Sequence, residues 1–245
     1  METPVQYLGG KSRLGKKIAE IINPLLVGGA PYYEPFCGGC NVAQYIKADW
    51  RLLTDAHPQL IAMWKAVQAG WVPPDSVSEA EYAAAKRGEL SPELTAFIGF
   101  GCSFGGKWFG GYARGGEDRS YASNARNSIM KKLPGIISAH FDVTDFRQLV
   151  PRKGCVIYCD PPYASTTGYG GVGDFDSGAF WNWTRRMLGE GHTVVVSEYV
   201  APEDFVCIAE LPTKLDMRDA GGKSPRIERL FTHAKSRNLQ EKSEV

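Results

Sequence analysis

Apolar and polar residues alternate along this chain with two periods, which predict helices and strands in turn. A helical period over residues 12–23, with Ser12 as its cap and Pro24 as its stop, is followed by a short strand at 32–36 and a glycine turn. A second helix is expected at 42–48, capped by Asn41. The other expected elements are strands at 51–54, 156–159, 193–197, 205–211 and 227–232, and helices at 58–69, 79–86 and 177–188. The first elements in this order are typical of a parallel α/β sheet.

The alternation is interrupted between residues 70 and 135. This stretch begins near Pro73-Pro74 and contains a segment rich in glycine and aromatic residues at 99–112. It does not follow a strand–helix–strand pattern. We therefore predict a discontinuous α/β domain over 1–69 and 136–233, an insertion over 70–135 and a polar tail over 234–245.

The composition is that of a folded α/β protein and does not identify a partner. The chain has 245 residues with 28 Lys and Arg against 27 Asp and Glu, and aromatics make up 11 %, which argues against disorder. It has no run of about 18 apolar residues that would predict a membrane span. The start Met1-Glu2-Thr3-Pro4 does not resemble a signal peptide. Six cysteines fit no disulfide framework, so we expect a cytoplasmic protein.

The run Cys37-Gly38-Gly39-Cys40 leaves more than one interpretation open. Its C-x-x-C spacing occurs in redox and metal sites, but no second C-x-x-C is present to complete a zinc site. Its two glycines fit a loop whose backbone approaches a ligand closely. We expect no metal.

The sharpest local feature is Asp160-Pro161-Pro162-Tyr163, directly after the apolar strand at 156–159. Open α/β sheets bind ligands at this end of their strands. A carboxylate, a fixed carbonyl group and an aromatic ring suit a planar base that carries an amino group. The alternative is a plain turn at the end of a strand with a surface aspartate.

In their order along the chain, these motifs resemble those of the Dam-like DNA adenine-N6 methyltransferases, over about residues 5–233. Asp160-Pro161-Pro162-Tyr163 is similar to the catalytic tetrapeptide of that family. The other similar motifs are Tyr7-Leu8-Gly9-Gly10-Lys11, Glu34-Pro35-Phe36-Cys37-Gly38-Gly39, Asp55, Asp145-Phe146 and Arg226-Ile227-Glu228-Arg229-Leu230.

The resemblance implies a Rossmann-like S-adenosylmethionine-dependent methyltransferase sheet with an inserted, mainly helical target-recognition subdomain that carries a β-hairpin. It implies methyl transfer to N6 of an adenine flipped out of double-stranded DNA, with S-adenosylhomocysteine as the product and no metal. The catalytic residues implied are Asp160, Pro161, Pro162 and Tyr163. The cofactor-binding residues implied are Tyr7, Gly9, Gly10, Lys11, Glu34, Pro35, Phe36, Gly38, Gly39, Asp55, Asp145, Phe146 and Asp160.

Two of these residues have plainer alternatives. Asp55 is also suited to cap the helix that follows it, and Lys11 to be a solvated residue after a glycine turn. A DNA-binding relative without catalytic activity and a dinucleotide enzyme using the Gly38-Gly39 turn are the alternatives for the whole chain.

The formal net charge of +1 hides local clustering. Residues 101–135 carry Lys107, Arg114, Arg119, Arg126, Lys131 and Lys132 against Glu117 and Asp118, interleaved with aromatic residues. A second basic cluster lies beside Lys11. We expect the insertion to contact DNA through Lys107, Trp108, Tyr112, Arg114 and Arg126. The alternative is a hairpin whose aromatic residues pack on its own helices.

The chain departs from the family pattern at three positions. Gln6 and Gly111 stand where the family has basic residues that read bases, so the resemblance does not extend to the recognition sequence GATC. Cys40 stands where the family often has a further glycine. The resemblance implies a bacterial or phage enzyme, solitary or paired with a restriction enzyme. We expect a monomer, with a dimer on DNA as the alternative.

Overall fold

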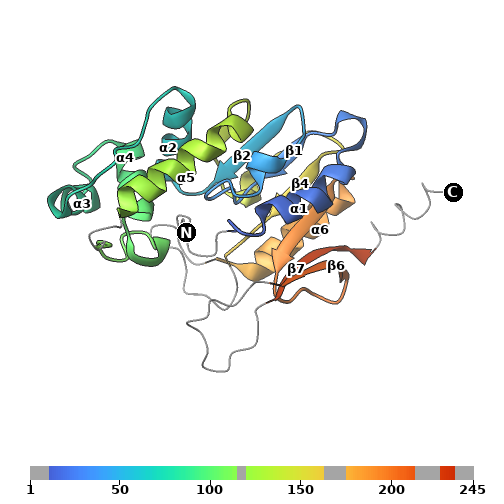
Figure 1. Cartoon of the computed structure of the whole chain (residues 1–245). Coiled ribbons are helices and arrows are strands. Elements are labelled where there is room, and N and C mark those ends of the chain that lie inside the picture. The colour runs from blue at the N-terminus through green and yellow to red at the C-terminus, as the bar shows by residue number, and fades with distance from the viewer. Residues whose placement is uncertain (1–10, 115–119, 163–174, 213–226, 235–245) are drawn as a thin grey trace.

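A seven-stranded sheet organises the protein (Figure 1). The computed structural model describes residues 11–114, 120–162, 175–212 and 227–234. The strands are β1 (Tyr32–Glu34), β2 (Arg51–Asp55), β3 (His140–Val143), β4 (Val156–Cys159), β5 (Thr193–Glu198), β6 (Phe205–Pro212) and β7 (Ile227–His233), in the order β3-β2-β1-β4-β5-β7-β6. β1 to β5 are parallel, whereas β7 is antiparallel to its neighbours β5 and β6. The expected Rossmann-like α/β class is confirmed.

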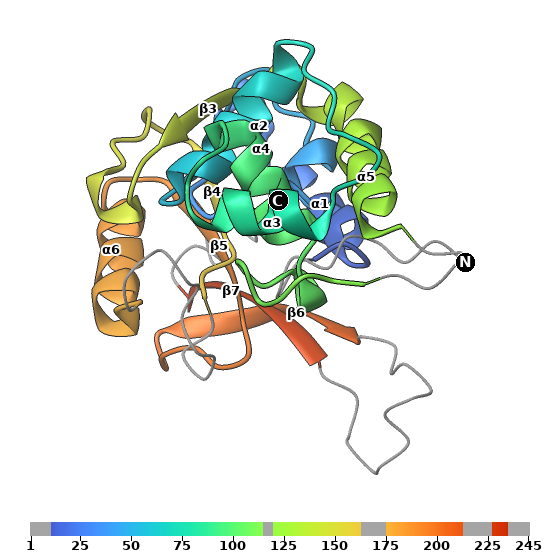
Figure 2. The ribbon, with the colours of Figure 1, turned by 90° about the vertical axis from the view of Figure 1, so that its left-hand side faces the viewer.

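Successive residues of the central strands pack on opposite faces of the sheet. Tyr32 and Tyr158 belong to one core, and Tyr33 and Ile157 belong to the other. The first core includes residues of α1 (Gly15–Ile22), α2 (Pro58–Gln68) and the insertion, and the second includes α6 (Ser177–Gly189) and the short helix η6 (Phe146–Gln148). Figure 2 shows α6 on one side of the sheet, with α1 and α5 (Tyr121–Ile136) on the other.

The first helix starts later than the sequence predicts. α1 begins at Gly15, its N-cap position is Leu14, and no side chain caps it, so the prediction that Ser12 is the cap was wrong. The reason is a tight turn before the helix, in which the carbonyl group of Lys11 accepts from the N–H groups of Leu14 and Gly15. A single 3₁₀ turn, η1 (Asn23–Leu25), contains Pro24 and follows the helix.

The predicted helix at 42–48 is reduced to one 3₁₀ turn, η3 (Ala43–Tyr45), and Asn41 does not cap it. The carbonyl groups of Ala43 and Ile46 accept hydrogen bonds from the guanidinium group of Arg51, both at 3.3 Å. Asn23 satisfies further backbone groups of this segment, because it donates to Tyr45 and accepts from Lys47. With these partners the backbone does not need a helical ladder.

The insertion is mainly helical. It contains α3 (Glu79–Lys86), α4 (Pro92–Ala96), the π-helical turn η4 (Phe97–Gly101), the 3₁₀ turn η5 (Phe104–Gly106) and α5. The expected hairpin is a single antiparallel bridge between Ser103 and Tyr112, flanked by two backbone hydrogen bonds of 2.9 Å. The sequence reasoning had not placed β3 or α5, and α5 crosses the expected boundary at residue 135. The domain boundaries themselves stay a prediction.

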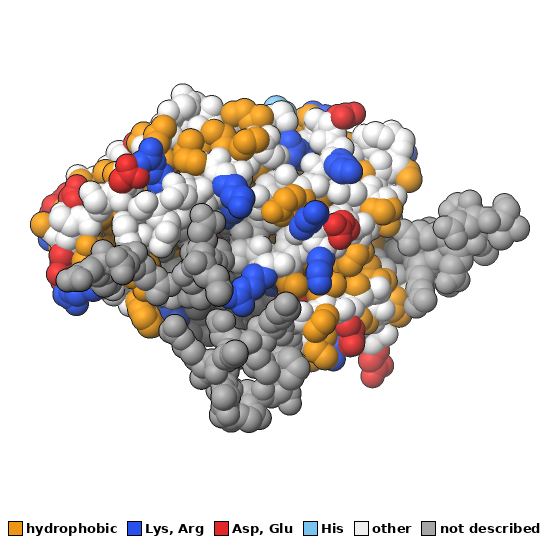
Figure 3. Space-filling model, in the orientation of Figure 1, with side chains coloured by type: hydrophobic (Ala, Val, Ile, Leu, Met, Phe, Trp, Pro, Cys, Tyr) orange, Lys and Arg blue, Asp and Glu red, His pale blue; other side chains and the backbone are white. Residues whose placement is uncertain are grey.

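Basic side chains gather on the face that α1 and α5 cover (Figure 3). Lys16 and Lys17 of α1 and Lys131 of α5 are exposed. None of the described helices is both long and apolar enough to cross a membrane.

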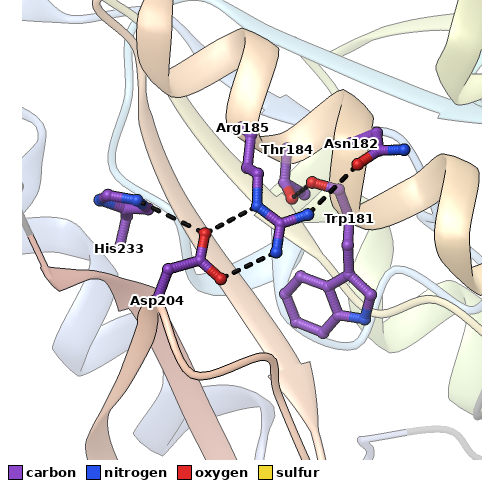
Figure 4. Close-up of polar contacts among 6 residues, drawn as sticks. All are labelled: Trp181, Asn182, Thr184, Arg185, Asp204 and His233. Atoms are coloured by element: carbon purple, nitrogen blue, oxygen red, sulfur yellow. Dashed lines mark hydrogen bonds and ion pairs between the residues drawn. The ribbon is translucent and has the colours of Figure 1, made fainter.

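Arg185 ties α6 to the antiparallel end of the sheet (Figure 4). Its Nε and Nη2 atoms donate to the two carboxylate oxygens of Asp204 at 2.7 and 2.8 Å. Nε2 of His233, at the end of β7, lies 3.6 Å from Oδ2 of the same carboxylate. The next residue, Phe205, packs on Trp181 with ring centroids 4.7 Å apart.

Candidate active site

Asp160 directly follows β4 and meets residues from two distant parts of the chain. Nζ of Lys11 lies 2.9 Å from Oδ1 of Asp160 and 3.3 Å from Oε2 of Glu228 in β7. The hydroxyl group of Ser197, at the end of β5, donates to Oε1 of Glu228 at 2.6 Å. Pro161 is buried beside Asp160. The late motif around Glu228 and the early motif around Lys11 therefore converge on the catalytic tetrapeptide expected from the sequence.

This cluster holds opposite charges in a site that is largely shielded from water. Burial raises the pKa of Asp160 to about 6, while the ammonium group of Lys11 acts to lower it. Burial acts to lower the pKa of Lys11, but Asp160 and Glu228 outweigh it, and the pKa lies above its usual value. At pH 7 Lys11 is charged and most of Asp160 is ionised.

The segment after β1, residues 37–40, forms a turn that we call the glycine loop. The N–H group of Gly38 donates to Oδ2 of Asp55 at 3.1 Å, and Nε1 of Trp64 donates to the carbonyl oxygen of Gly38 at 2.9 Å. Gly38 and Cys40 have φ angles of 46° and 52°. Cys40 therefore adopts the left-handed conformation that favours glycine, the residue expected there in many members of the family that the motifs resemble.

Asp55 lies at the end of β2, next to the glycine loop. Besides Gly38, it accepts a 2.9 Å hydrogen bond from the N–H group of His57, and burial raises its pKa to about 6. It does not cap α2, because the ring of His57 does so by accepting from Leu60. A carboxylate offers about four acceptor positions, so two backbone bonds leave capacity for hydroxyl groups of a ligand.

Glu34, the last residue of β1, is fully enclosed. It accepts a 2.6 Å hydrogen bond from the hydroxyl group of Tyr32, and burial raises its pKa to about 8. The side chain is therefore mostly neutral at pH 7.

The structure also brings the two expected phenylalanines together. The ring centroids of Phe36 and Phe146 lie 5.5 Å apart, and both rings pack in the second core. Pro35, between Glu34 and Phe36, is buried. The carboxylate of Asp145 accepts two 2.8 Å bonds from the guanidinium group of Arg147.

Several expected residues lie outside the described residues. They are Tyr7, Gly9, Gly10 and Tyr163 of the site, together with Gln6, Glu117, Asp118, Arg119 and the tail beyond Ala234.

Two of the expected DNA-contacting residues are partly buried and pack against the first core. The ring centroid of Trp108 lies 4.3 Å from the ring centroid of His57 and 4.7 Å from that of Phe100. The hydroxyl group of Tyr112 donates to the carbonyl group of Val77 at 2.7 Å. These contacts favour the alternative in which the aromatic residues of the hairpin support it from within.

The expected basic residues differ in their exposure. Lys107 and Arg114 are exposed, and Arg114 forms an ion pair with Glu79 at 2.5 Å, whereas Arg126 is partly buried and forms an ion pair with Asp75. Phe104, at the same hairpin, is 70 % exposed; it is one of the aromatic residues interleaved with the basic ones, but not one of the expected DNA contacts.

Lys132 is a residue of the site that the sequence reasoning assigned elsewhere. It was counted with the cations facing DNA, but its Nζ donates to the carbonyl group of Gly39 at 2.7 Å. A signal was present, because Ala125, Ile129 and Ile136 are buried on one stripe of α5 and Lys132 falls in the same helical spacing.

Residues 7–92 match the family model of the D12 class N6 adenine-specific DNA methyltransferases. The match includes the glycine loop and Asp55, and it confirms over these residues the resemblance drawn from the motifs. The N-terminal part of the chain thus matches a family of DNA methyltransferases.

Other comparisons add less. No curated protein sequence matches the chain. Among solved structures, "Putative methyltransferase yhhF from Escherichia coli" is 10 % identical, covers 90 % of this chain and 85 % of its own, and has a TM-score of 0.39. An RNA methyltransferase from Pyrococcus horikoshii, also described as putative, is 9 % identical, covers 89 % and 82 %, and has a TM-score of 0.42. At these scores neither structure bears on the substrate.

Proposed function

We propose that this protein transfers a methyl group from S-adenosylmethionine to N6 of an adenine in double-stranded DNA. The observation that carries the proposal is the Asp160 carboxylate, which is partly buried and paired with Lys11 at the end of β4. β4 is hydrogen-bonded to β1, the strand that leads into the glycine loop. The two motifs therefore lie side by side at the carboxyl-terminal ends of these two central strands.

The residues around the glycine loop fit the proposed cofactor. Asp55 has acceptor capacity for the two ribose hydroxyl groups, and Gly38 and Gly39 present backbone without side chains. Phe36 and Phe146 offer apolar aromatic surface for an adenine ring, and Asp145 lies beside them. When bound, S-adenosylmethionine supplies an electrophilic methyl group on its sulfonium.

Asp160 and Pro161 supply acceptors for the target amino group. The exocyclic nitrogen is a poor nucleophile because its lone pair is delocalised into the ring. Hydrogen bonds from its protons to the Asp160 carboxylate and the Pro161 carbonyl group favour a pyramidal nitrogen with an available lone pair. An ionised Asp160 also stabilises the positive charge that develops on this nitrogen and accepts the proton it loses. The resemblance assigns the stack on the base, which has been flipped out of the duplex, to Tyr163, a residue outside the described part of the chain.

Lys11 sets the charge state that this chemistry needs. Its ammonium group opposes the effect of burial on Asp160 and keeps the carboxylate mostly ionised at neutral pH. Glu228 and Ser197 in turn hold Lys11 in place from the neighbouring strands.

The insertion supplies the DNA contacts. Lys107 and Phe104 present an exposed cation and an exposed ring at one hairpin, which suits a phosphate contact and a stack on an unpaired base. Trp108 and Tyr112 support this hairpin through their internal packing. Arg114 and Arg126 exchange their carboxylate partners for phosphates.

The test is to express the protein in cells that lack adenine methylation and to sequence their DNA with a method that detects N6-methyladenine. Wild type should add N6-methyladenine in one sequence context, and Asp160→Ala should add none while its thermal unfolding stays cooperative. Methylation by Asp160→Ala at the wild-type level would overturn the proposal. DNA binding without binding of S-adenosylhomocysteine would instead identify a relative without catalytic activity.

A further inference from the structure

We propose that Lys132 is a positioning residue that holds the glycine loop from the insertion and thereby links DNA contact to cofactor affinity. The inference rests on the proposed function and extends it to a residue outside the expected cofactor motifs. It is carried by three sets of contacts in the described part of the chain.

The first set fixes the glycine loop from three directions. Asp55 accepts from the N–H group of Gly38, and Trp64 of α2 donates to the carbonyl group of the same residue. Lys132 of α5 donates to the carbonyl group of Gly39. Two of these three anchors come from the α/β domain, and the third comes from the helix that closes the insertion.

The second set joins the C-terminal end of α5 to the segment that follows the loop. A side chain at Gly135 would collide with the carbonyl group of Gln44, so the helix backbone lies directly against this segment. Nη1 of Arg51 donates to the carbonyl groups of Gly135 at 2.5 Å and of Ala43 at 3.3 Å. This end of α5 is therefore held against the segment that directly follows the glycine loop.

The third set joins the N-terminal end of α5 to the rest of the insertion. The hydroxyl group of Ser120, the N-cap residue, donates to the backbone carbonyl of Asp75 at 3.2 Å. Arg126 forms an ion pair with the carboxylate of the same Asp75. If DNA phosphates draw Arg126 away from Asp75, the change acts on the same helix that carries Lys132.

Lys132 is unsuited to be a simple surface cation. Its ammonium group is enclosed near Cys40, and burial lowers the pKa of Lys132 to about 8. Replacing the ammonium group by an apolar one relieves the cost of burying the charge, which offsets the loss of the hydrogen bond to Gly39. The residue is therefore better explained by the bond it makes than by any gain in stability.

A matched pair of variants tests the proposal. Lys132→Met removes the donor and shortens the side chain by only one atom, and Lys131→Met makes the same change at the adjacent exposed lysine. Binding of S-adenosylhomocysteine is measured by calorimetry without DNA and again with sheared unmethylated DNA. Melting temperatures and the KM and kcat for S-adenosylmethionine are measured on the same samples.

Lys132→Met should weaken S-adenosylhomocysteine binding about 10-fold and raise KM about as much. Its kcat at saturating cofactor should change less than about twofold, and its melting temperature should not fall. Lys131→Met should bind the product as wild type does. DNA should raise the product affinity of wild type and Lys131→Met, and the gain should be smaller in Lys132→Met.

Wild-type product affinity in Lys132→Met would overturn the positioning role. An unchanged gain from DNA in that variant would overturn the link between the two sites. Failure of the wild-type protein to bind S-adenosylhomocysteine at all would instead count against the proposed function, so the two failures are distinguishable.

Discussion

The ammonium nitrogen of Lys11 lies 2.9 Å from Oδ1 of Asp160, although the two residues come from opposite halves of the chain. Lys11 is almost fully buried and also reaches Glu228. Without Lys11, two carboxylates would face each other in a poorly hydrated site, and the charge on Asp160 would be opposed by both burial and Glu228.

Lys11→Met should therefore raise the pKa of Asp160 above its wild-type value of about 6. In wild type, kcat/KM should rise with pH through about 6 as Asp160 loses its proton. In the variant the same rise should occur at least one pH unit higher, so activity lost at pH 7 is partly recovered at pH 8.5. The measurement is the pH profile of methyl transfer.

Lys17→Met on the exposed face of α1 is the control, and it should keep the wild-type profile. Lys11→Met could instead lose activity equally at every pH, with the rise in kcat/KM still near pH 6. That result would show that Lys11 acts by some means other than the charge of Asp160.

The positive φ angle of Cys40 leads to a second prediction, which concerns stability. A non-glycine residue with a φ of 52° carries a cost of about 1–2 kcal/mol, which glycine does not have. Cys40→Gly should recover this energy and lose a comparable amount through the missing buried side chain and the more flexible unfolded chain. The net change in the free energy of unfolding should stay within about 1 kcal/mol, as measured by urea denaturation.

Cys37 provides the comparison, since it is also buried and has no positive φ. Cys37→Gly suffers the same losses without the gain, so it should be less stable than Cys40→Gly by about 1–2 kcal/mol. Equal losses in the two variants would mean that the left-handed conformation is not a source of strain here.

The sequence was sufficient for six of the seven strands and for the corner at Asp160, because these depend on local patterns, but it did not predict β3. The strand at 156–159 and the prolines after it define that corner whatever the rest of the chain does. It was not sufficient for η3, where Arg51 takes over carbonyl groups that a helix would use. Nor did it reveal the roles of Lys132 and Trp64, which depend on contacts between segments far apart in the sequence.

Glu34 makes a prediction about stability. Its folded pKa of about 8 lies above the ordinary value of 4.5, so the native state keeps a proton that the unfolded chain has lost between these pH values. Stability therefore falls as pH rises through this window, by up to about 1.4 kcal/mol per pH unit. Glu34→Gln removes this slope, and its stability relative to wild type should improve by a few kcal/mol between pH 5 and pH 8.5.

Urea denaturation at pH 5, 7 and 8.5 measures this difference. Glu20→Gln, on the exposed face of α1, should keep the wild-type dependence on pH. A constant difference between Glu34→Gln and wild type at all three pH values would contradict the prediction.

In the hairpin of the insertion, we expect Phe104 to contact DNA and Tyr112 to stabilise the fold. Phe104 is 70 % exposed, so Phe104→Ala should change the free energy of unfolding by no more than about 0.5 kcal/mol. If its ring stacks on a base, the same variant should lose about 1–3 kcal/mol of DNA-binding free energy. Tyr112→Phe removes the hydroxyl group that donates to Val77, so it should lose about 1 kcal/mol of stability and bind DNA as wild type does. Thermal unfolding and fluorescence anisotropy with labelled unmethylated DNA measure the two effects. If Phe104→Ala instead lowered the melting temperature and Tyr112→Phe weakened DNA binding, the roles of the two residues would be exchanged.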